Sequence, residues 1–202
     1  MSFKNSLVVF ILLLSFSTKA SFILLPMDET TQQNHLKAYG ITYWCLDKKY
    51  KASWLLNYRG GSFLLPDTEE IRKECQIRGV SFEVLSDSET KSILDDISSP
   101  SQNMENVILE KAPKIAVYTP KGKQPWDDAV TLVLTYAEIP FTPIYDEEVL
   151  SDGLLLYDWL HLHHEDFTGQ YGKFFGAYRN SPWYIEQKKT AEELATKLGY
   201  SK

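Results

Sequence analysis

The feature that most constrains the fold is a strand–helix–strand pattern that begins at Lys114. The pattern predicts strands over 114–118, 141–145 and 159–163, and helices over 125–139 and 183–198. Strands separated by connections of this length require parallel crossovers. We therefore expect an α/β layer whose functional edge lies at the carboxyl ends of its strands.

The preceding region mixes helices and strands. Its pattern predicts strands over 22–25, 41–46, 54–58, 62–65 and 80–85, and helices near 35–39 and over 67–78 and 87–97. Arg59-Gly60-Gly61 lies between two apolar runs and predicts a hairpin that turns on glycine. Ser86 or Asp87 is expected to cap the helix that ends at Ile97.

A polar, proline-containing run over 98–106 predicts a linker between the two regions. The expected organisation is a mixed α and β region over 21–97, a linker over 98–106 and an α/β domain over 107–202.

Residues 1–20 predict a cleaved export signal. Lys4 gives a basic start, the apolar stretch 6–16 is too short for a stable anchor, and Thr18-Lys19-Ala20 places small residues where a signal peptidase reads them. We expect cleavage near Ala20 and a periplasmic or extracellular protein. The alternative is an uncleaved anchor flanked by Lys19. No later apolar run is long enough to span a bilayer, so we expect no integral membrane segment in the mature chain.

Charge and cysteine usage limit the function classes. The chain has 27 acidic and 21 basic side chains, a net charge of −6, which argues against nucleic acid or an anionic membrane surface as a partner.

Cys45 and Cys75 are the only cysteines, and they form either one disulfide or two buried free thiols. Neither lies in a glycine-flanked elbow or next to a histidine, so a catalytic thiol is not expected.

Three of the four histidines, His161, His163 and His164, lie within four positions. On a strand, Trp159, His161, His163 and Glu165 would share one face. Two histidines at i and i+2 have Cα atoms about 6.5–7 Å apart. They can therefore bind one divalent metal ion, with Glu165 as the third ligand.

Two other interpretations of this cluster stay open. His163 or His164 can act as a general acid or base oriented by Glu165 or Asp166, which makes these four residues the catalytic candidates. Alternatively, the imidazoles are structural groups at the end of a strand. The following glycine- and aromatic-rich segment 167–176 is either a lid over the histidines or a packed surface loop.

A binding role would use a partly different set of residues. The candidate ligand-binding residues are Arg59, Trp159, His161, His163 and Tyr171. Arg59 and nearby backbone N–H groups of the predicted hairpin can bind an anion, although an ordinary turn explains the same residues. Aromatic and imidazole groups near glycines suit a polar small molecule or a glycan.

Four stretches, LKAYGI at 36–41, WLLNYRGGSF at 54–63, PWDDAVTL at 125–132 and the run 157–172, resemble a family of bacterial exported proteins that carries the name asparagine synthetase B. The resemblance covers 21–202 and implies that the chain is the N-terminal half of a family member. The second region is similar to the first half of a flavodoxin-like sheet of the class I glutamine amidotransferase type. This similarity implies an incomplete parallel sheet that later sequence or a second chain completes.

The family name implies ATP-dependent asparagine synthesis, whose sequence requirements are absent here. That reaction needs a cysteine nucleophile at the mature N-terminus and a Ser-Gly-Gly-X-Asp-Ser loop for ATP, whereas the predicted mature terminus is Ser21 and the paired glycines precede Ser62. We therefore expect no such activity. The sequence favours a small-molecule or carbohydrate binding module without a complete catalytic set. The alternative is part of a hydrolase or amidotransferase-like enzyme whose remaining catalytic residues lie beyond residue 202.

Overall fold

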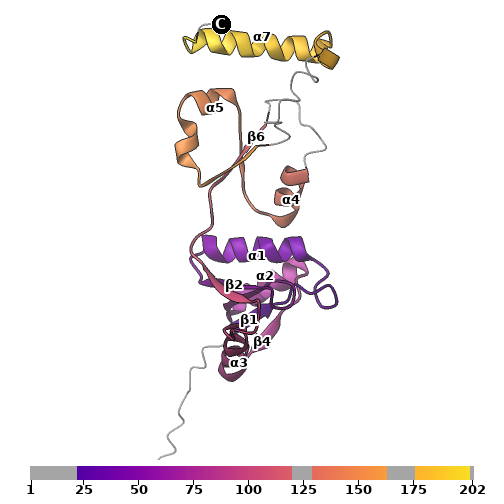
Figure 1. Cartoon of the computed structure of the whole chain (residues 1–202), viewed down its shortest axis with the longest axis vertical. Helices are drawn as coiled ribbons and strands as arrows, with labels where there is room; N and C mark the ends of the chain where they lie inside the picture. Colours follow the sequence, from indigo (N-terminus) through magenta and orange to yellow (C-terminus); the bar gives the residue numbers. More distant parts are fainter. Residues whose placement is uncertain (1–21, 120–128, 163–175, 201–202) are drawn as a thin grey trace, which may run out of the picture.

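The computed structural model describes residues 22–119, 129–162 and 176–200, which form two sheets that follow one another along the chain (Figure 1). The first sheet is antiparallel and has five strands, and the second is parallel and has three. The chain is therefore mixed α and β, with the parallel sheet in its second half, as the sequence predicts. The export signal predicted over 1–20 lies outside the described residues.

The first sheet has the strand order β4-β1-β3-β2-β5. Its strands are β1 (Phe22–Leu25), β2 (Ala52–Leu56), β3 (Ser62–Pro66), β4 (Glu83–Leu85) and β5 (Glu105–Leu109). Side chains alternate between its faces, so Ile23 and Leu25 are buried in one core and Leu24 in another. Burial on both faces explains why β1 and β3 are continuous apolar runs.

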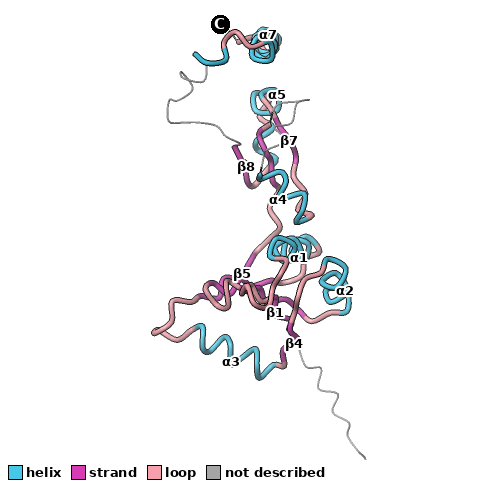
Figure 2. The backbone as a smooth tube through the Cα atoms, turned by 90° about the vertical axis from the view of Figure 1, so that its right-hand side faces the viewer, coloured by secondary structure: helices cyan, strands magenta, loops and turns pink. Residues whose placement is uncertain are grey.

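Three helices cover these two faces (Figure 2). They are α1 (His35–Asp47) and α2 (Glu69–Arg78) on the side of Ile23, and α3 (Asp87–Ile97) on the side of Leu24. The side chain of Ser86 accepts a hydrogen bond from the backbone N–H of Glu89, whose carboxylate accepts one from the N–H of Ser86. This capping box confirms the predicted start of α3.

The segment 41–46 is helical, so the strand predicted there is wrong. The segment is rich in the β-branched and aromatic side chains that favour strands. However, the buried positions of α1 include Ala38, Ile41, Thr42 and Cys45, which follow the three- and four-residue spacing of a helix face. Packing of that face against the sheet overrides the local propensity.

The first sheet extends further along the chain than the sequence predicts. The linker predicted over 98–106 ends inside β5, which pairs with all five residues of β2. Only Val107 and Leu109 of β5 are half-buried, so the strand carries a weak apolar signal and its extended conformation depends on pairing. The segment that connects the two sheets is therefore 110–114.

The predicted hairpin between β2 and β3 is confirmed. Gly60 has φ 80°, and a Cβ atom at this position would lie 2.4 Å from the backbone oxygen of Met27. The backbone N–H of Met27 also donates a hydrogen bond to the oxygen of Arg59 at 3.1 Å. Glycine is required here by both its backbone conformation and this close approach.

The second sheet has the order β7-β6-β8, and both of its pairings are parallel. It contains β6 (Ile115–Tyr118), β7 (Thr142–Ile144) and β8 (Trp159–Leu162), with the helices α4 (Ala129–Ala137), α5 (Asp146–Leu150) and α7 (Pro182–Lys197) and the 3₁₀ helix η1 (Gly153–Leu156). Within the described residues the three predicted strands and both predicted helices are confirmed, whereas residues 125–128 and 163 of these predictions lie outside them. The helices α5 and η1 were not predicted.

Helix α4 joins the second sheet to α1 (Figure 1). An added Cβ atom at Gly40 would lie 1.8 Å from the backbone oxygen of Ala137. Next to this contact, Glu138 lies 2.5 Å from the Nζ atom of Lys37 and 3.3 Å from an Nη atom of Arg78. The hydrogen bond from Lys37 holds the pKa of Glu138 below its ordinary value. One carboxylate thus connects α4 to both α1 and α2.

Much apolar surface in the second half of the chain is exposed. Helix α7 buries none of its residues, and Leu155 in η1 is 86% exposed. The main packed cluster of the parallel sheet is small, with Ile115, Val117 and Leu134 as its buried residues. Among the described helices, none has the length and apolar character needed to cross a membrane.

Candidate functional site

The carboxyl ends of the three parallel strands bring polar and aromatic side chains to one edge of the sheet. Tyr118 ends β6, Tyr145 and Asp146 follow β7, and His161 lies one residue before the end of β8. The strand that comes first in sequence is central, with β7 on one side and β8 on the other. This reversal of strand order creates a topological switch point between β6 and β8, where open parallel sheets bind ligands.

Two tyrosines and an aspartate form a hydrogen-bonded group at this edge. The hydroxyl of Tyr118 donates to Oδ1 of Asp146, and the rings of Tyr118 and Tyr145 lie 5.2 Å apart with an angle of 32° between their planes. The Nε2 atom of Gln187 in α7 donates to the hydroxyl of Tyr145 at 3.2 Å. The group combines flat apolar ring surface with hydrogen-bonding atoms, which is the combination that sugars and other polar small molecules require.

Thr119 directly follows β6 and is only 3% exposed. Its backbone N–H donates to the oxygen of Ile144 at 2.9 Å, whereas its buried hydroxyl has no hydrogen-bond partner among the described residues. A buried hydroxyl without a partner is unfavourable and uncommon in folded proteins. Thr119 therefore places an unused hydrogen-bonding group at the switch point.

Trp159 and His161 share one face of β8, as predicted, with their rings 6.4 Å apart in an edge-on arrangement. The register places His161 beside Val117, which is buried against α4. Side chains alternate along β6, so His161 and Thr119 lie on the α4 side of the sheet and Tyr118 lies on the other side. The candidate groups approach the edge from both faces.

The other predicted residues of the histidine cluster lie outside the described residues. These are His163, His164, Glu165, Asp166 and Tyr171. Within the described part of the chain, no three His, Cys, Asp or Glu residues are arranged to hold a metal ion. Because two of the three predicted ligands fall outside that part, the divalent metal site stays a prediction.

Arg59 lies in the first region, far along the chain from the histidines. Its Nε donates to Asp28 at 3.0 Å, its two Nη atoms donate to Glu83 at 2.8 and 2.9 Å, and one Nη also donates to Thr31 at 3.3 Å. The paired hydrogen bonds to Glu83 contribute most to a raised pKa of Arg59. In this arrangement the guanidinium ties the hairpin to β4 and to the segment after β1.

Cys45 and Cys75 are both buried as free thiols in the core beside α1 and α2. Burial raises the pKa of each thiol to about 12. Because the thiolate is the reactive form, neither residue can act as a nucleophile at neutral pH.

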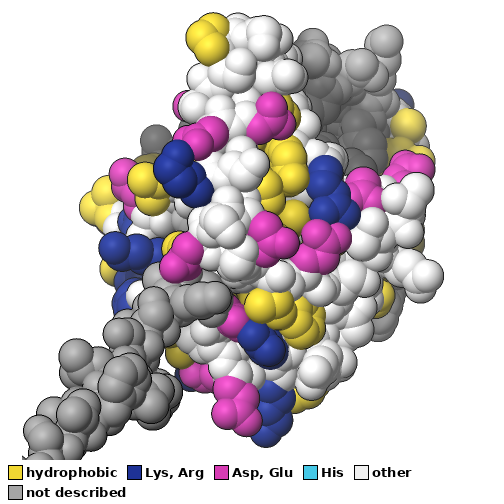
Figure 3. Space-filling view, turned by 90° about the horizontal axis from the view of Figure 1, so that it is seen from below, with side chains coloured by type: hydrophobic (Ala, Val, Ile, Leu, Met, Phe, Trp, Pro, Cys, Tyr) yellow, Lys and Arg dark blue, Asp and Glu magenta, His cyan; other side chains and the backbone are white. Residues whose placement is uncertain are grey.

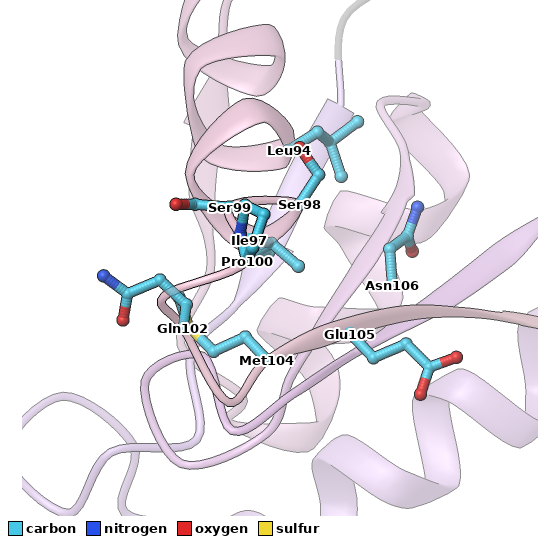
Figure 4. Close-up of a pocket in the computed structure, with 9 residues that line it drawn as sticks. All are labelled: Leu94, Ile97, Ser98, Ser99, Pro100, Gln102, Met104, Glu105 and Asn106. Carbon is cyan, nitrogen blue, oxygen red and sulfur yellow. The ribbon is translucent and has the colours of Figure 1, made fainter.

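A separate pocket of 420 Å³ lies between the end of α3 and the start of β5 (Figure 4). Leu94 and Ile97 come from α3, Met104 from the connecting loop, and Asn106 from β5. The sequence pattern missed this pocket because seven of its nine lining residues fall in the predicted linker 98–106.

Although one signal was present, the sequence also missed four residues at the sheet edge: Tyr118, Thr119, Tyr145 and Asp146. Asp146 comes directly after an apolar strand of a predicted parallel sheet, where a polar residue falls at the functional edge. The unpartnered hydroxyl of Thr119 depends on its tertiary surroundings and has no signature in sequence. No protein-family model, curated protein or solved structure matches the chain.

Proposed function

We propose that the chain binds a polar small molecule or a carbohydrate at the carboxyl edge of its parallel sheet. The observation that carries this proposal is the buried, unpartnered hydroxyl of Thr119 at the switch point. A bound ligand would supply the missing hydrogen bond. The stacked rings of Tyr118 and Tyr145 offer a surface for a sugar ring, and Asp146 offers an acceptor for its hydroxyl groups.

The same proposal includes a flavodoxin-like class for the second region. Flavodoxin-like sheets have the strand order 2-1-3-4-5. The order β7-β6-β8 corresponds to the first three of these strands, which supports the assignment. Together with the motifs at 36–41, 54–63, 125–132 and 157–172, it supports a relationship to the exported asparagine synthetase B family and export directed by residues 1–20.

Binding is favoured over cysteine-based amidotransfer within this chain. The only two cysteines are buried and stay protonated at neutral pH, so neither supplies the thiolate that such a reaction needs. Neither buried thiol therefore supports a cysteine-dependent amidotransferase-like reaction.

The test is saturation-transfer difference NMR with a panel of hexoses, N-acetylhexosamines and free amino acids. Thr119→Val removes the hydroxyl while it keeps the shape of the side chain, and Asp146→Asn removes the charged acceptor. Thr90→Val is the matched control, because Thr90 in α3 is also buried, at 5% exposure, and its hydroxyl also lacks a partner.

We expect at least one compound of the panel to bind, with at least tenfold weaker binding to Thr119→Val and unchanged binding to Thr90→Val. Equal binding by both threonine variants, or no binding to the unmodified chain, would refute the proposed function.

A further inference from the structure

Strand β5 leaves one edge of the first sheet open. In the described residues 22–119, 129–162 and 176–200, β5 is the terminal strand and pairs only with β2. Edge strands are usually protected by lysine, proline or a bulge. The residues of β5, Glu105–Leu109, include neither lysine nor proline, and Ile108 is 72% exposed. Its free backbone groups can therefore pair with another extended segment.

The pocket at the end of α3 lies beside this edge and on a defined side of it (Figure 4). Asn106 pairs in register with Leu55, whose side chain belongs to the core on the α3 side of the sheet. Asn106 and Ile108 therefore project toward α3, as the pocket does. A strand added along β5 would place every second side chain on this side, within reach of Leu94, Ile97 and Met104.

The charge around the pocket is negative. The last turn of α3 contains Asp95 and Asp96 and no basic residue, although the carboxyl end of a helix already carries a partial negative charge. Lys91 pairs with Asp95 at 2.6 Å, and Glu105 lines the pocket although strand alternation places its side chain on the opposite face of the sheet from Asn106. Figure 3 shows the molecule from the end where α3 lies, with acidic and basic side chains interspersed beside small apolar patches. The acidic last turn of α3 favours a cationic partner at the pocket.

We propose that the outer edge of β5 and the adjacent pocket bind an extended, lysine- or arginine-containing peptide segment of another protein. The peptide backbone pairs with β5 as a sixth strand of the sheet. The aliphatic stem of a basic side chain packs on Leu94, Ile97 and Met104, and its charged end lies near the acidic last turn of α3, which contains Asp95 and Asp96. This interaction is independent of the ligand site proposed at the parallel sheet.

The test is fluorescence anisotropy with a labelled octapeptide of alternating threonine and lysine, titrated with the full chain in 50 mM and 500 mM NaCl. Two peptides serve as controls: one with glutamate in place of lysine, and one with lysine retained but alternate backbone amides methylated so that they cannot pair with a strand. We expect the unmodified lysine peptide to bind at least tenfold more tightly than either control, and its binding to weaken at high salt.

Variants at the two ends of the same sheet locate the site. Ile108→Lys adds a charge to β5, and the matched control Val84→Lys makes the same type of change on the opposite edge strand β4, where Val84 is 48% exposed. We expect at least tenfold weaker peptide binding for Ile108→Lys and no change for Val84→Lys. Asp95→Asn combined with Asp96→Asn should weaken binding in 50 mM NaCl and have little effect in 500 mM NaCl.

Three outcomes would overturn this inference. They are equal binding of the lysine and glutamate peptides, equal effects of the two lysine substitutions, and failure of the chain to bind the lysine peptide. If the chain does not bind the lysine peptide, sedimentation tests whether a second copy of the chain occupies the edge of β5 instead. That occupant is identified if the chain dimerises and Ile108→Lys dissociates the dimer. Thr119→Val should leave peptide binding unchanged. The peptide-binding test at β5 and the ligand-binding test at the parallel sheet can therefore fail independently of each other.

Discussion

Replacing Gly40 with alanine is expected to destabilise the protein, although alanine is the better helix former. Helix propensity alone favours the substitution by about 1 kcal/mol. However, the new Cβ atom would lie 1.8 Å from the backbone oxygen of Ala137 in α4, whereas ordinary van der Waals contact begins at 3.4 Å. The two helices would have to separate by about 1.6 Å at this point, because a backbone oxygen cannot rotate away as a side chain can.

This separation has a cost that can be worked out from the contacts around it. Overpacking of a well-packed contact costs about 1–3 kcal/mol. The upper end applies here because the movement loosens the packing of Tyr43 against the core of the parallel sheet and lengthens the 2.5 Å contact between Lys37 and Glu138. After subtraction of the gain in helix propensity, we expect the free energy of unfolding to fall by about 2 kcal/mol.

Urea denaturation followed by circular dichroism measures this change, and hydrogen exchange of the α4 amides shows where protection is lost. Gly176→Ala is the matched control, since Gly176 is also helical and an added Cβ atom there meets nothing within 4 Å. That substitution should leave stability unchanged or raise it by up to about 1 kcal/mol. A Gly40→Ala protein at least as stable as the unmodified chain would refute the close packing of α1 on α4.

Further predictions concern a helix cap, an ion pair and the thiols. Ser86→Ala should lower the free energy of unfolding by about 1 kcal/mol through loss of the capping box, measured by urea denaturation. The pKa of Glu138 is lowered by Lys37, so its stabilisation is present above the ordinary value of 4.5 and is lost as the pH falls through the lowered pKa. The Tm of Glu138→Gln should therefore fall less between pH 6 and pH 3 than the Tm of the unmodified chain. An equal fall in both proteins would contradict this. Cys45 and Cys75, whose pKa values are raised to about 12, should react with Ellman's reagent at pH 8 only after unfolding, so rapid labelling of the native chain would contradict their burial.

The sequence predicts the elements whose signals are local and misses those that depend on tertiary contacts. The cap at Ser86 and the glycine hairpin at Gly60 need only neighbouring residues, and both are confirmed. The error over 41–46 arises because strand propensity competes with a helical burial pattern that only the packed sheet selects. The strand β5 was missed because pairing with β2, and not its own apolar pattern, keeps it extended.

The candidate sites follow the same rule. The functional edge of the parallel sheet is predictable from the strand–helix–strand pattern, since parallel strands share their carboxyl ends. The unpartnered hydroxyl of Thr119 depends on what surrounds it in space. Likewise, the bonding of Arg59 to Asp28 and Glu83 joins segments that are distant in sequence, so the hairpin motif alone could not reveal it.

The position of β1 inside the first sheet has a consequence for how the chain folds. Phe22 pairs with Pro66 on one side and with Leu85 on the other, so the strand that is synthesised first acquires both neighbours only after β3 and β4 have been made. A topology dominated by such distant pairings slows folding relative to a helical bundle of similar stability. Until then, the apolar residues of β1 remain exposed in the growing polypeptide, where a chaperone can hold the chain unfolded.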